Sequence, residues 1–326
     1  MRNIIKRWRV LMLARNTQRI LLGLILSFSL VLGACGNGEK KESGKKAETR
    51  VVSTVKGDVE IPAEPKRIVA LYYHHILFAM DIKPVGANLT WWGGSPFLTE
   101  QEKDLTDVGG PPSLEAVAAL NPDLIIMNSN NEENYEDLAK IAPSILIPYD
   151  GSRSAYDDAK LVAEILGKPS AAEELQTKFD VKAEAARKRI EGKVTEGTTA
   201  AIIRIEGKGS QFSVFGDNYG RGGWSIYHGL NLQMPDIIKT ELIDSKAQIV
   251  QQLSLERLSE YVGDADYIFV SNEGEGLDQL ENSEVWKSLP AVKNNKVIEL
   301  DKKYFFFDPI SIEGQLDLIT DLIAKH

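Results

Sequence analysis

One cationic side chain interrupts an otherwise apolar run. Arg204 stands within Ala200–Ile205, a segment of small and β-branched residues that predicts a buried strand. A charge in such a strand needs a partner, because burying an unpaired charge is costly. The partner could be a bound anion, or a carboxylate in a structural salt bridge. Arg204 is therefore the first candidate for contacting an anionic ligand.

Aromatic and polar side chains also gather in segments that follow other predicted strands. The further candidates are Tyr72, His74, His75, Trp91, Trp92, Asn130, Arg221, Trp224 and Tyr304. Loops at strand ends that face a cleft commonly carry binding residues. Arginine donates charge-assisted hydrogen bonds to ligand oxygens, and aromatic rings cover broad apolar faces. The Trp pair could instead pack the protein interior, and the segment from Tyr304 to Phe307 is expected to be half core.

The adjacent histidines His74 and His75 raise the question of a metal site, since imidazole is a common metal ligand. Neighbouring histidines rarely face one ion together, and no cysteine or nearby His–carboxylate set completes a ligand sphere. We therefore expect no direct metal ligation and favour a hydrogen-bonding role at the start of a helix.

Short apolar segments alternate with helical ones along most of the chain. Strands are predicted at residues 67–71, 84–87, 122–127, 144–148, 200–205, 211–215, 265–270 and 296–300. Helices are predicted at residues 74–80, 113–120, 135–141, 154–166, 220–230, 254–258 and 311–324. Such alternation predicts an α/β protein whose mainly parallel sheets carry helices on both faces.

A long helix is predicted over residues 170–190, which are rich in Ala, Glu, Lys and Arg and contain neither Gly nor Pro. The segments before and after it echo each other, because both run Ser-Leu-Glu, helix, Asp, apolar strand. We therefore expect two Rossmann-like lobes joined by a single long rigid helix, with a ligand in the cleft between them. The expected boundaries are 51–168 for the first lobe, 169–192 for the helix and 193–326 for the second lobe.

The first 35 residues have the layout of an export signal. Positive charges precede the apolar run Ile20–Leu32, and small residues then lead to Cys35. The run is too short to span a bilayer comfortably. The box Leu32-Gly33-Ala34-Cys35 resembles the bacterial lipoprotein signal, which implies cleavage after residue 34 and acylation of Cys35. An uncleaved anchor, or an ordinary signal with an incidental cysteine, is the alternative, and either Met1 or Met12 could be the start.

Composition places the mature chain outside the nucleic-acid binders. Removing residues 1–34 takes away six Lys or Arg and no acid, so the formal charge falls from −9 to −15. An acidic body argues against nucleic acid as a partner. Residues 35–50 lack large apolar side chains and are expected to form a flexible tether. Some 275 residues remain to fold, which suits two lobes of ordinary size.

An ordered set of short motifs is similar to one family of extracytoplasmic binding proteins. Ile61-Pro-Ala-Glu-Pro-Lys-Arg-Ile-Val69, Pro84-Val-Gly86 and Asp107-Val-Gly109 come first. Asn121-Pro-Asp-Leu-Ile-Ile126 and Leu289-Pro-Ala-Val-Lys-Asn-Asn-Lys-Val297 follow in the same order. Together they resemble the periplasmic-type binding proteins for iron-siderophores, haem and cobalamin, over nearly the whole mature chain.

The resemblance implies a lipid-anchored, monomeric carrier on the outer face of the cell membrane that delivers its ligand to an ABC importer. The ligand implied is a ferric siderophore, with Fe(III) carried as part of that complex and no cofactor of the protein's own. The family's permease-docking carboxylates map to Glu115 and Glu256. Each could equally be a solvated acid favoured by the helix dipole in the first turn of its helix.

Three alternatives to siderophore binding remain open on the sequence alone. Haem and cobalamin are carried by the same fold, and the sequence does not separate catecholate, hydroxamate and citrate-type siderophores. A lipid-anchored hydrolase is the alternative of another class, but neither Gly-x-Ser-x-Gly nor His-Glu-x-x-His occurs, and there are only four histidines. We therefore expect a binding protein and not an enzyme. A purely structural or signalling lipoprotein is a third alternative.

Overall fold

The computed structural model describes residues 48–247, 249–273 and 276–326, and these belong to one compact unit. The predicted signal, Cys35 and most of the predicted tether lie outside the described residues. The last two tether positions, Thr49 and Arg50, open a strand instead. Among the described residues, none of the helices combines the length and apolar character that a bilayer crossing requires.

A five-stranded sheet with the order β5-β4-β3-β6-β7, parallel throughout, forms the first lobe, as the alternating pattern predicted. Its strands are β3 (Ile68–Ala70), β4 (Gly86–Ala87), β5 (Thr106–Asp107), β6 (Leu124–Asn128) and β7 (Ser144–Ile147). Its helices are α1 (His74–Ala79), α2 (Leu89–Trp92), α3 (Thr99–Glu102), α4 (Leu114–Ala119), η1 (Ser129–Asn134), α5 (Tyr135–Leu138) and α6 (Ala155–Ile165). An antiparallel hairpin of β1 (Thr49–Thr54) and β2 (Gly57–Pro62), which the sequence did not predict, precedes them.

The sheet of the second lobe, β10-β9-β8-β11-β12, is mixed. Its strands are β8 (Ala200–Glu206), β9 (Gln211–Phe215), β10 (Ile249–Ser254), β11 (Tyr267–Ser271) and β12 (Val297–Leu300). β11 runs parallel to β8 and β12, whereas β9 is antiparallel to both of its neighbours. The helical segments are η2 (Gly207–Gly209), η3 (Ser225–Gly229), α8 (Asp236–Ile238), η4 (Lys239–Asp244), η5 (Leu255–Arg257), α9 (Leu258–Val262), α10 (Leu277–Glu281), α11 (Glu284–Ser288), α12 (Pro290–Lys293) and η6 (Lys302–Phe305).

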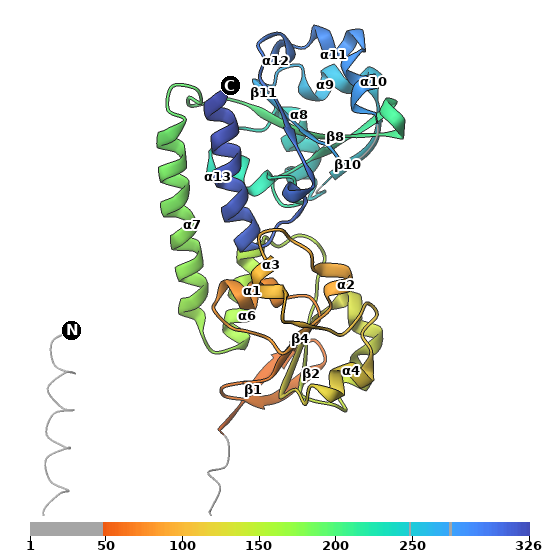
Figure 1. The fold of residues 1–326 in the computed structure, drawn as a ribbon, viewed down its shortest axis with the longest axis vertical. Helices are drawn as coiled ribbons and strands as arrows, with labels where there is room; N and C mark the ends of the chain where they lie inside the picture. The colour runs from red at the N-terminus through yellow and green to blue at the C-terminus, as the bar shows by residue number, and fades with distance from the viewer. Residues whose placement is uncertain (1–47, 248, 274–275) are drawn as a thin grey trace, which may run out of the picture. The chain divides into compact units, whose positions relative to one another are not determined.

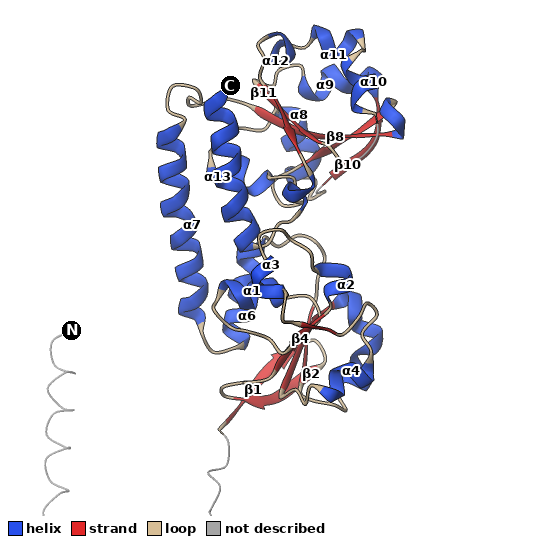
Figure 2. Ribbon diagram, in the orientation of Figure 1, coloured by secondary structure: helices blue, strands red, loops and turns tan. Residues whose placement is uncertain are grey.

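The predicted long helix is α7 (Pro169–Arg189), and a second helix, α13 (Pro309–Lys325), lies beside it (Figure 1). Both sheets lie to one side of these two helices (Figure 2). The connection between the lobes is therefore wider than the single helix that the sequence suggested.

The core explains how α7 and α13 hold the lobes. One continuous cluster of buried side chains contains β3 residues, β8 residues, Phe179 of α7 and Leu316 of α13. The opposite faces of the two sheets are buried in separate clusters, so the central strands β3, β6, β8 and β11 are apolar on both faces. The lobes thus share one core along the two long helices.

The sequence echo between the halves has a structural counterpart at the start of each central strand. Asp123, just before β6, accepts hydrogen bonds from the backbone N–H groups of Lys66 (2.7 Å) and Arg67 (2.9 Å), just before β3. Asp266, just before β11, accepts from the backbone N–H of Thr199 (2.8 Å), just before β8. In both lobes an aspartate therefore sets the register of two adjacent parallel strands.

Candidate functional site

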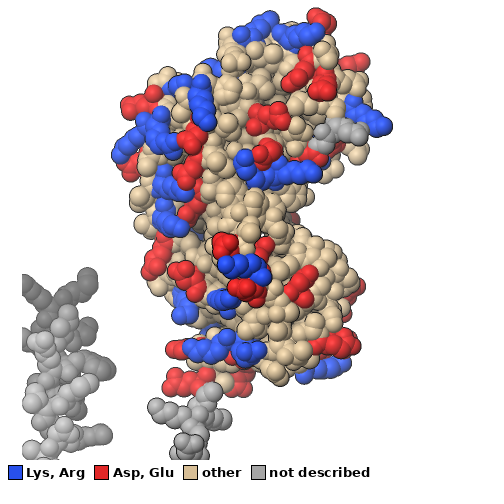
Figure 3. All heavy atoms as spheres, viewed as in Figure 1, with Lys and Arg blue, Asp and Glu red and all other residues tan. Residues whose placement is uncertain are grey.

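A cleft of about 690 Å³ lies where the carboxyl ends of strands from both lobes face each other. Figure 3 shows the molecule notched between its upper and lower parts. The lining includes Tyr72, His75, Trp91, Trp92, Tyr149, Asp150, Arg153, Asp158, Arg204, Tyr219, Arg221, Gln251, Phe305, Phe306, Phe307 and Asp308. Six of the ten predicted ligand-binding residues are among them: Tyr72, His75, Trp91, Trp92, Arg204 and Arg221. Their role in binding stays a prediction.

The first-lobe wall of the cleft is aromatic. The ring of Tyr72 meets the ring of Trp92 edge to face, with centroids 4.8 Å apart, and meets His75 in the same way at 5.4 Å. Trp91 remains 46% exposed. Trp91 shares the cleft with two other exposed rings, Tyr219 and Phe305, and exposed apolar side chains that gather in one place often mark a binding site.

Asp107 holds the short helix α2 that carries both tryptophans. Its carboxylate accepts hydrogen bonds from the backbone N–H of Leu89 (3.0 Å), the hydroxyl of Thr90 (2.8 Å) and the backbone N–H of Gly109 (2.9 Å). Asn88 adds an N-cap to the N–H of Trp91 at 3.1 Å. The motif Asp107-Val-Gly109 therefore acts on the cleft indirectly, by fixing α2.

The two adjacent histidines point to different places, because successive residues on a helix project in different directions. His75 lines the cleft, and burial, with the neighbouring His74, lowers its pKa well below the usual value. His74 is fully buried behind it, with Nε2 3.0 Å from Oε1 of Glu102. The predicted hydrogen-bonding role fits His74, which is not at the cleft surface. Within the described ranges, no cluster of three or more His, Cys, Asp or Glu could hold a metal ion.

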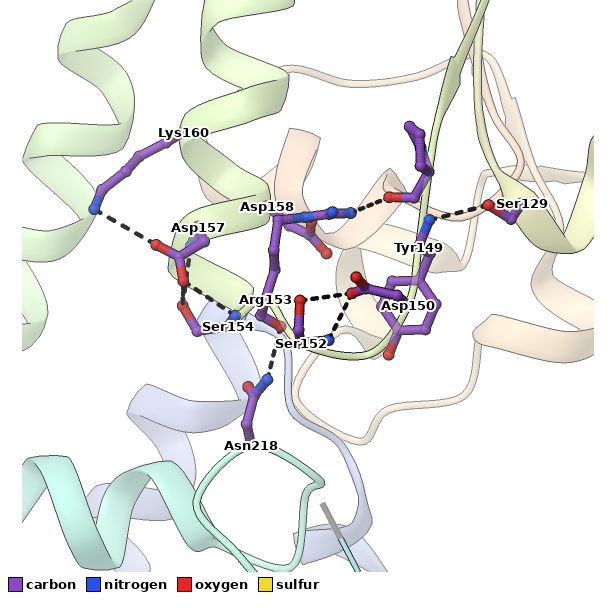
Figure 4. A network of polar contacts seen from close by, with 11 residues as sticks. Ser129, Tyr149, Asp150, Ser152, Arg153, Ser154, Asp157, Asp158, Lys160 and Asn218 are labelled. Carbon is purple, nitrogen blue, oxygen red and sulfur yellow. Dashed lines mark hydrogen bonds and ion pairs between the residues drawn. The ribbon is translucent and has the colours of Figure 1, made fainter. Parts of the chain in front are cut away.

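Arg153 is a cleft residue that the sequence reasoning missed. It lies in the loop after β7, where its Nε donates to Asp158 at 2.6 Å and its guanidinium also donates to the carbonyl of Pro148 (Figure 4). Burial raises the pKa of Asp158, and the hydrogen bond from Arg153 opposes that rise. The backbone carbonyl of Arg153 accepts from the side chain of Asn218 in the second lobe, 2.7 Å away (Figure 4).

The second-lobe wall places two arginines beside two glutamates. Arg204 donates from Nε to Glu206 at 3.0 Å and has a longer contact of 3.4 Å with Glu273. Arg221 donates to both oxygens of Glu273, at 2.7 and 2.9 Å. Of the two partners that the sequence allowed for Arg204, the carboxylate is present, and the side chain still faces the cleft.

Local backbone geometry and aromatic rings fix Arg221. Its own backbone is left-handed (φ 54°), a conformation uncommon for residues other than glycine. At the preceding Gly220 (φ 71°), a Cβ would lie 2.1 Å from the carbonyl oxygen of Phe305, so glycine is required there. The guanidinium lies 4.3 Å from the ring centroid of Phe215 and 4.8 Å from that of Phe305. An uncommon backbone conformation that the surrounding contacts hold in place is typical of functional sites.

Four predicted residues are not brought to the cleft. His74 is buried, as described above, and Asn130 is exposed on η1, a helical segment kinked at Asn131. Trp224 is packed at the start of η3, with its ring stacked 4.0 Å from His228. Tyr304 is only 3% exposed in the core, whereas the three phenylalanines that follow it line the cleft.

A buried polar chain connects the lobes behind the cleft. Asp308, on the cleft wall, accepts from the backbone N–H of Ser311 at 2.9 Å and from its hydroxyl at 2.5 Å. The Ser311 hydroxyl also lies 2.7 Å from the hydroxyl of Ser95 in the first lobe. Burial raises the pKa of Asp308, and the hydrogen bonds from Ser311 lower it by a smaller amount. The chain ties the start of α13 to the loop after α2.

The predicted docking carboxylates occupy equivalent positions in the two lobes. Glu115 lies in the first turn of α4, capped by Ser113, and Glu256 lies in η5, capped by Ser254. Both are exposed, and neither has a Lys or Arg partner among the residues that the structure describes. The geometry therefore leaves both carboxylates available to an external cation.

Comparison with known proteins places this architecture. A family model described as periplasmic binding protein matches residues 81–304. The iron(3+)-hydroxamate-binding protein YxeB of Bacillus subtilis is 39% identical over 318 residues, covering 94% of this chain and 97% of that protein. The iron(3+)-hydroxamate-binding protein FhuD of the same organism is 35% identical and covers 90% and 94%.

A solved structure agrees with these relatives. It is a FhuD fold-family periplasmic binding protein component of a ferrichrome ABC transporter from Bacillus subtilis, with a TM-score of 0.72 and 33% sequence identity. The match covers 84% of this chain and 100% of that one. The predicted fold class, two α/β lobes joined by a long helix, is confirmed.

Proposed function

Because this chain belongs to the periplasmic binding protein family, we propose that it captures a ferric siderophore of the hydroxamate type in its interlobe cleft and delivers it to an ABC importer. The observation that carries the proposal is the cleft itself. Three of the exposed large apolar side chains, Trp91, Tyr219 and Phe305, line it beside Arg204 and Arg221. Rings for a broad organic ligand and N–H donors for its oxygens are thus brought together.

The siderophore class is supported by the relatives. Both B. subtilis proteins described above are named for iron(3+)-hydroxamate binding. Their similarity extends over 94% and 90% of this chain, which is far more than either lobe alone. The cargo Fe(III) would be held by the siderophore's own oxygens, and the protein's part would be to bind the outer surface of the complex.

A titration of the body (residues 36–326) with a ligand panel tests this function. Ferrichrome, ferric enterobactin, ferric citrate, haem and cobalamin would each be added while tryptophan fluorescence is followed, because Trp91 and Trp92 line the cleft. We expect ferrichrome to bind at least about tenfold more tightly than the others, a difference of about 1.4 kcal/mol. Mass spectrometry should recover the ligand unaltered, as expected for binding without catalysis. Tight binding of haem or cobalamin alone, or of nothing in the panel, would contradict the proposal.

We also propose that the carrier is held on the extracytoplasmic face of the membrane by lipid on Cys35. The support is the sequence layout of residues 1–35, a positive segment, a short apolar run and a small-residue box before the cysteine. A lipid anchor would keep the carrier close to a permease in the same membrane.

Docking of the carrier on that permease is proposed to use Glu115 and Glu256. The support is their matched position after a serine cap in each lobe, their exposure, and the absence of an intramolecular cation beside either of them in the described part of the chain. Two carboxylates on separate lobes could engage two cationic sites on the importer.

A further inference from the structure

The arginines on the cleft wall are individually neutralised by carboxylates of this chain. Arg153 pairs with Asp158, Arg204 with Glu206, and Arg221 with Glu273. The cleft therefore presents guanidinium N–H groups whose positive charge is cancelled by the paired carboxylates. A ligand would find hydrogen-bond donors here, but little net attraction for an anion.

Glu273 is the member of this set that holds two arginines at once. Its carboxylate accepts both N–H groups of Arg221 and lies 3.4 Å from Nη1 of Arg204. The Arg221 side chain is 3% exposed and that of Glu273 is 20% exposed, so water screens their interaction only in part. The pKa of Glu273 is lowered overall. Burial raises it, but the hydrogen bond and charge of Arg221 and the hydrogen bond from Ser271 lower it by more.

The neighbouring strands build this arrangement in a regular way. Arg204 on β8 lies between Ser213 of β9 and Ser271 of β11 in the sheet register. Ser213 donates to Glu206 at 2.8 Å, and Ser271 donates to Glu273 at 2.8 Å. Each serine therefore orients one glutamate beside Arg204. Neither glutamate is itself among the residues that line the cleft, so both carboxylates act on it through the arginines that they pair with.

We propose that Glu273 is a specificity-determining residue, which keeps the second-lobe wall electrically balanced and so favours uncharged ferric complexes over anionic ones. The inference rests on the proposed siderophore function and deepens it. Three hydroxamates, each with a single negative charge, neutralise Fe(III), whereas three catecholates leave a strongly anionic complex. An anionic complex placed against Arg204 and Arg221 would also meet the charge of Glu273, and the repulsion would offset the attraction.

The test is the affinity ratio for two probes of different charge. Ferrichrome serves as the neutral complex and ferric enterobactin as the anionic one, and both are titrated by calorimetry into wild type, Glu273→Gln and Glu206→Gln. Glutamine keeps the shape and the carbonyl acceptor while removing the charge. Glu184→Gln is the matched control, because Glu184 loses the same charge from an exposed ion pair with Lys188 on α7.

In Glu273→Gln we expect the affinity for the anionic probe, relative to the neutral one, to rise at least about tenfold, which corresponds to about 1.4 kcal/mol. Glu206→Gln should shift the ratio in the same direction by a smaller factor, and Glu184→Gln should leave it unchanged. Raising the salt concentration should shrink the gain, since it comes from charge.

If the affinity ratio of the two probes is unchanged in a folded Glu273→Gln protein, the inference is overturned. The proposed function still stands in that case, provided that wild type binds ferrichrome. If Glu273→Gln does not fold, the ratio in Glu206→Gln decides in its place. Failure of wild type to bind either probe would overturn both the inference and the function on which it rests.

Discussion

Replacement of Trp91 by alanine removes the most exposed indole ring of the cleft. An aromatic side chain can bury roughly 150–250 Å², and Trp91 is 46% exposed, so about 70–115 Å² is available for a ligand to cover. At about 25 cal/mol per Å² of apolar surface, complete cover would contribute about 2–3 kcal/mol, and half cover about half of that. We therefore expect Trp91→Ala to weaken ferrichrome binding by about 10-fold to 100-fold.

Isothermal titration calorimetry is the suitable assay, because the substitution itself changes the tryptophan signal. Trp91→Phe should lose less affinity, since it keeps an aromatic face. The matched control is Val181→Ala, at a side chain that is 64% exposed on α7 and does not line the cleft. Trp91→Ala binding within about twofold of wild type would refute the reasoning, because it would mean that the exposed ring is not covered by ligand.

Three further predictions concern docking, the anchor and pH. Reversing charge at Glu115 and Glu256 together (both to Lys) should abolish cellular uptake of siderophore iron while calorimetry shows unchanged affinity, and surviving uptake would contradict docking through these residues. Cys35→Ala should bind ligand normally but leave the membrane fraction on cell fractionation, so retention there would count against lipidation. The pKa of Asp158 is raised by burial, so the folded state binds the proton more tightly than the unfolded state. The free energy of unfolding of wild type, compared with that of Asp158→Asn, should therefore fall as pH rises from the usual Asp pKa to beyond the raised pKa of the folded state. Urea titrations at several pH values measure this difference, and finding no such fall would refute the prediction.

Strong apolar periodicity made most of the fold predictable. Strands β3, β4, β6 and β7 of the first lobe and the helix α7 were expected within a few residues of where they lie, because their residues are buried on both faces or favour helix without a break. The two-residue strand β5, whose residues are exposed, and the hairpin of β1 and β2 were not expected. The antiparallel pairing of β10 with β9 was not expected. Gln251 and Gln252 interrupt the apolar pattern of β10, and the register shifts there while Gln252 adopts a left-handed backbone (φ 57°). The alternation of apolar and polar residues that would predict a strand is therefore lost at that point.

The cleft residues were predictable only where a side chain was unusual for its segment. Arg204 stood out because it is a charge in an apolar strand, and the Trp pair because large rings followed a strand. Arg153 lies in a polar loop where an arginine looks ordinary, and Glu273 looks like a solvated acid at a strand end. Their importance comes from partners far along the chain, such as Asn218 and Arg221, and no local pattern reveals those contacts.

The common core along α7 and α13 has a consequence for the energy of loading. A carrier whose empty form is mostly open loses apparent affinity in proportion to the fraction that is closed and competent to bind. Here Phe179 and Leu316 belong to a buried cluster that includes strands of both lobes, and Ser95 and Ser311 are bonded across the same region. Large separation of the lobes would break that packing, so we expect the empty protein to stay close to its binding-competent geometry. An importer of the kind proposed above would then have to distinguish loaded from empty forms by local changes at the cleft rim, and not by a large change in the distance between the lobes.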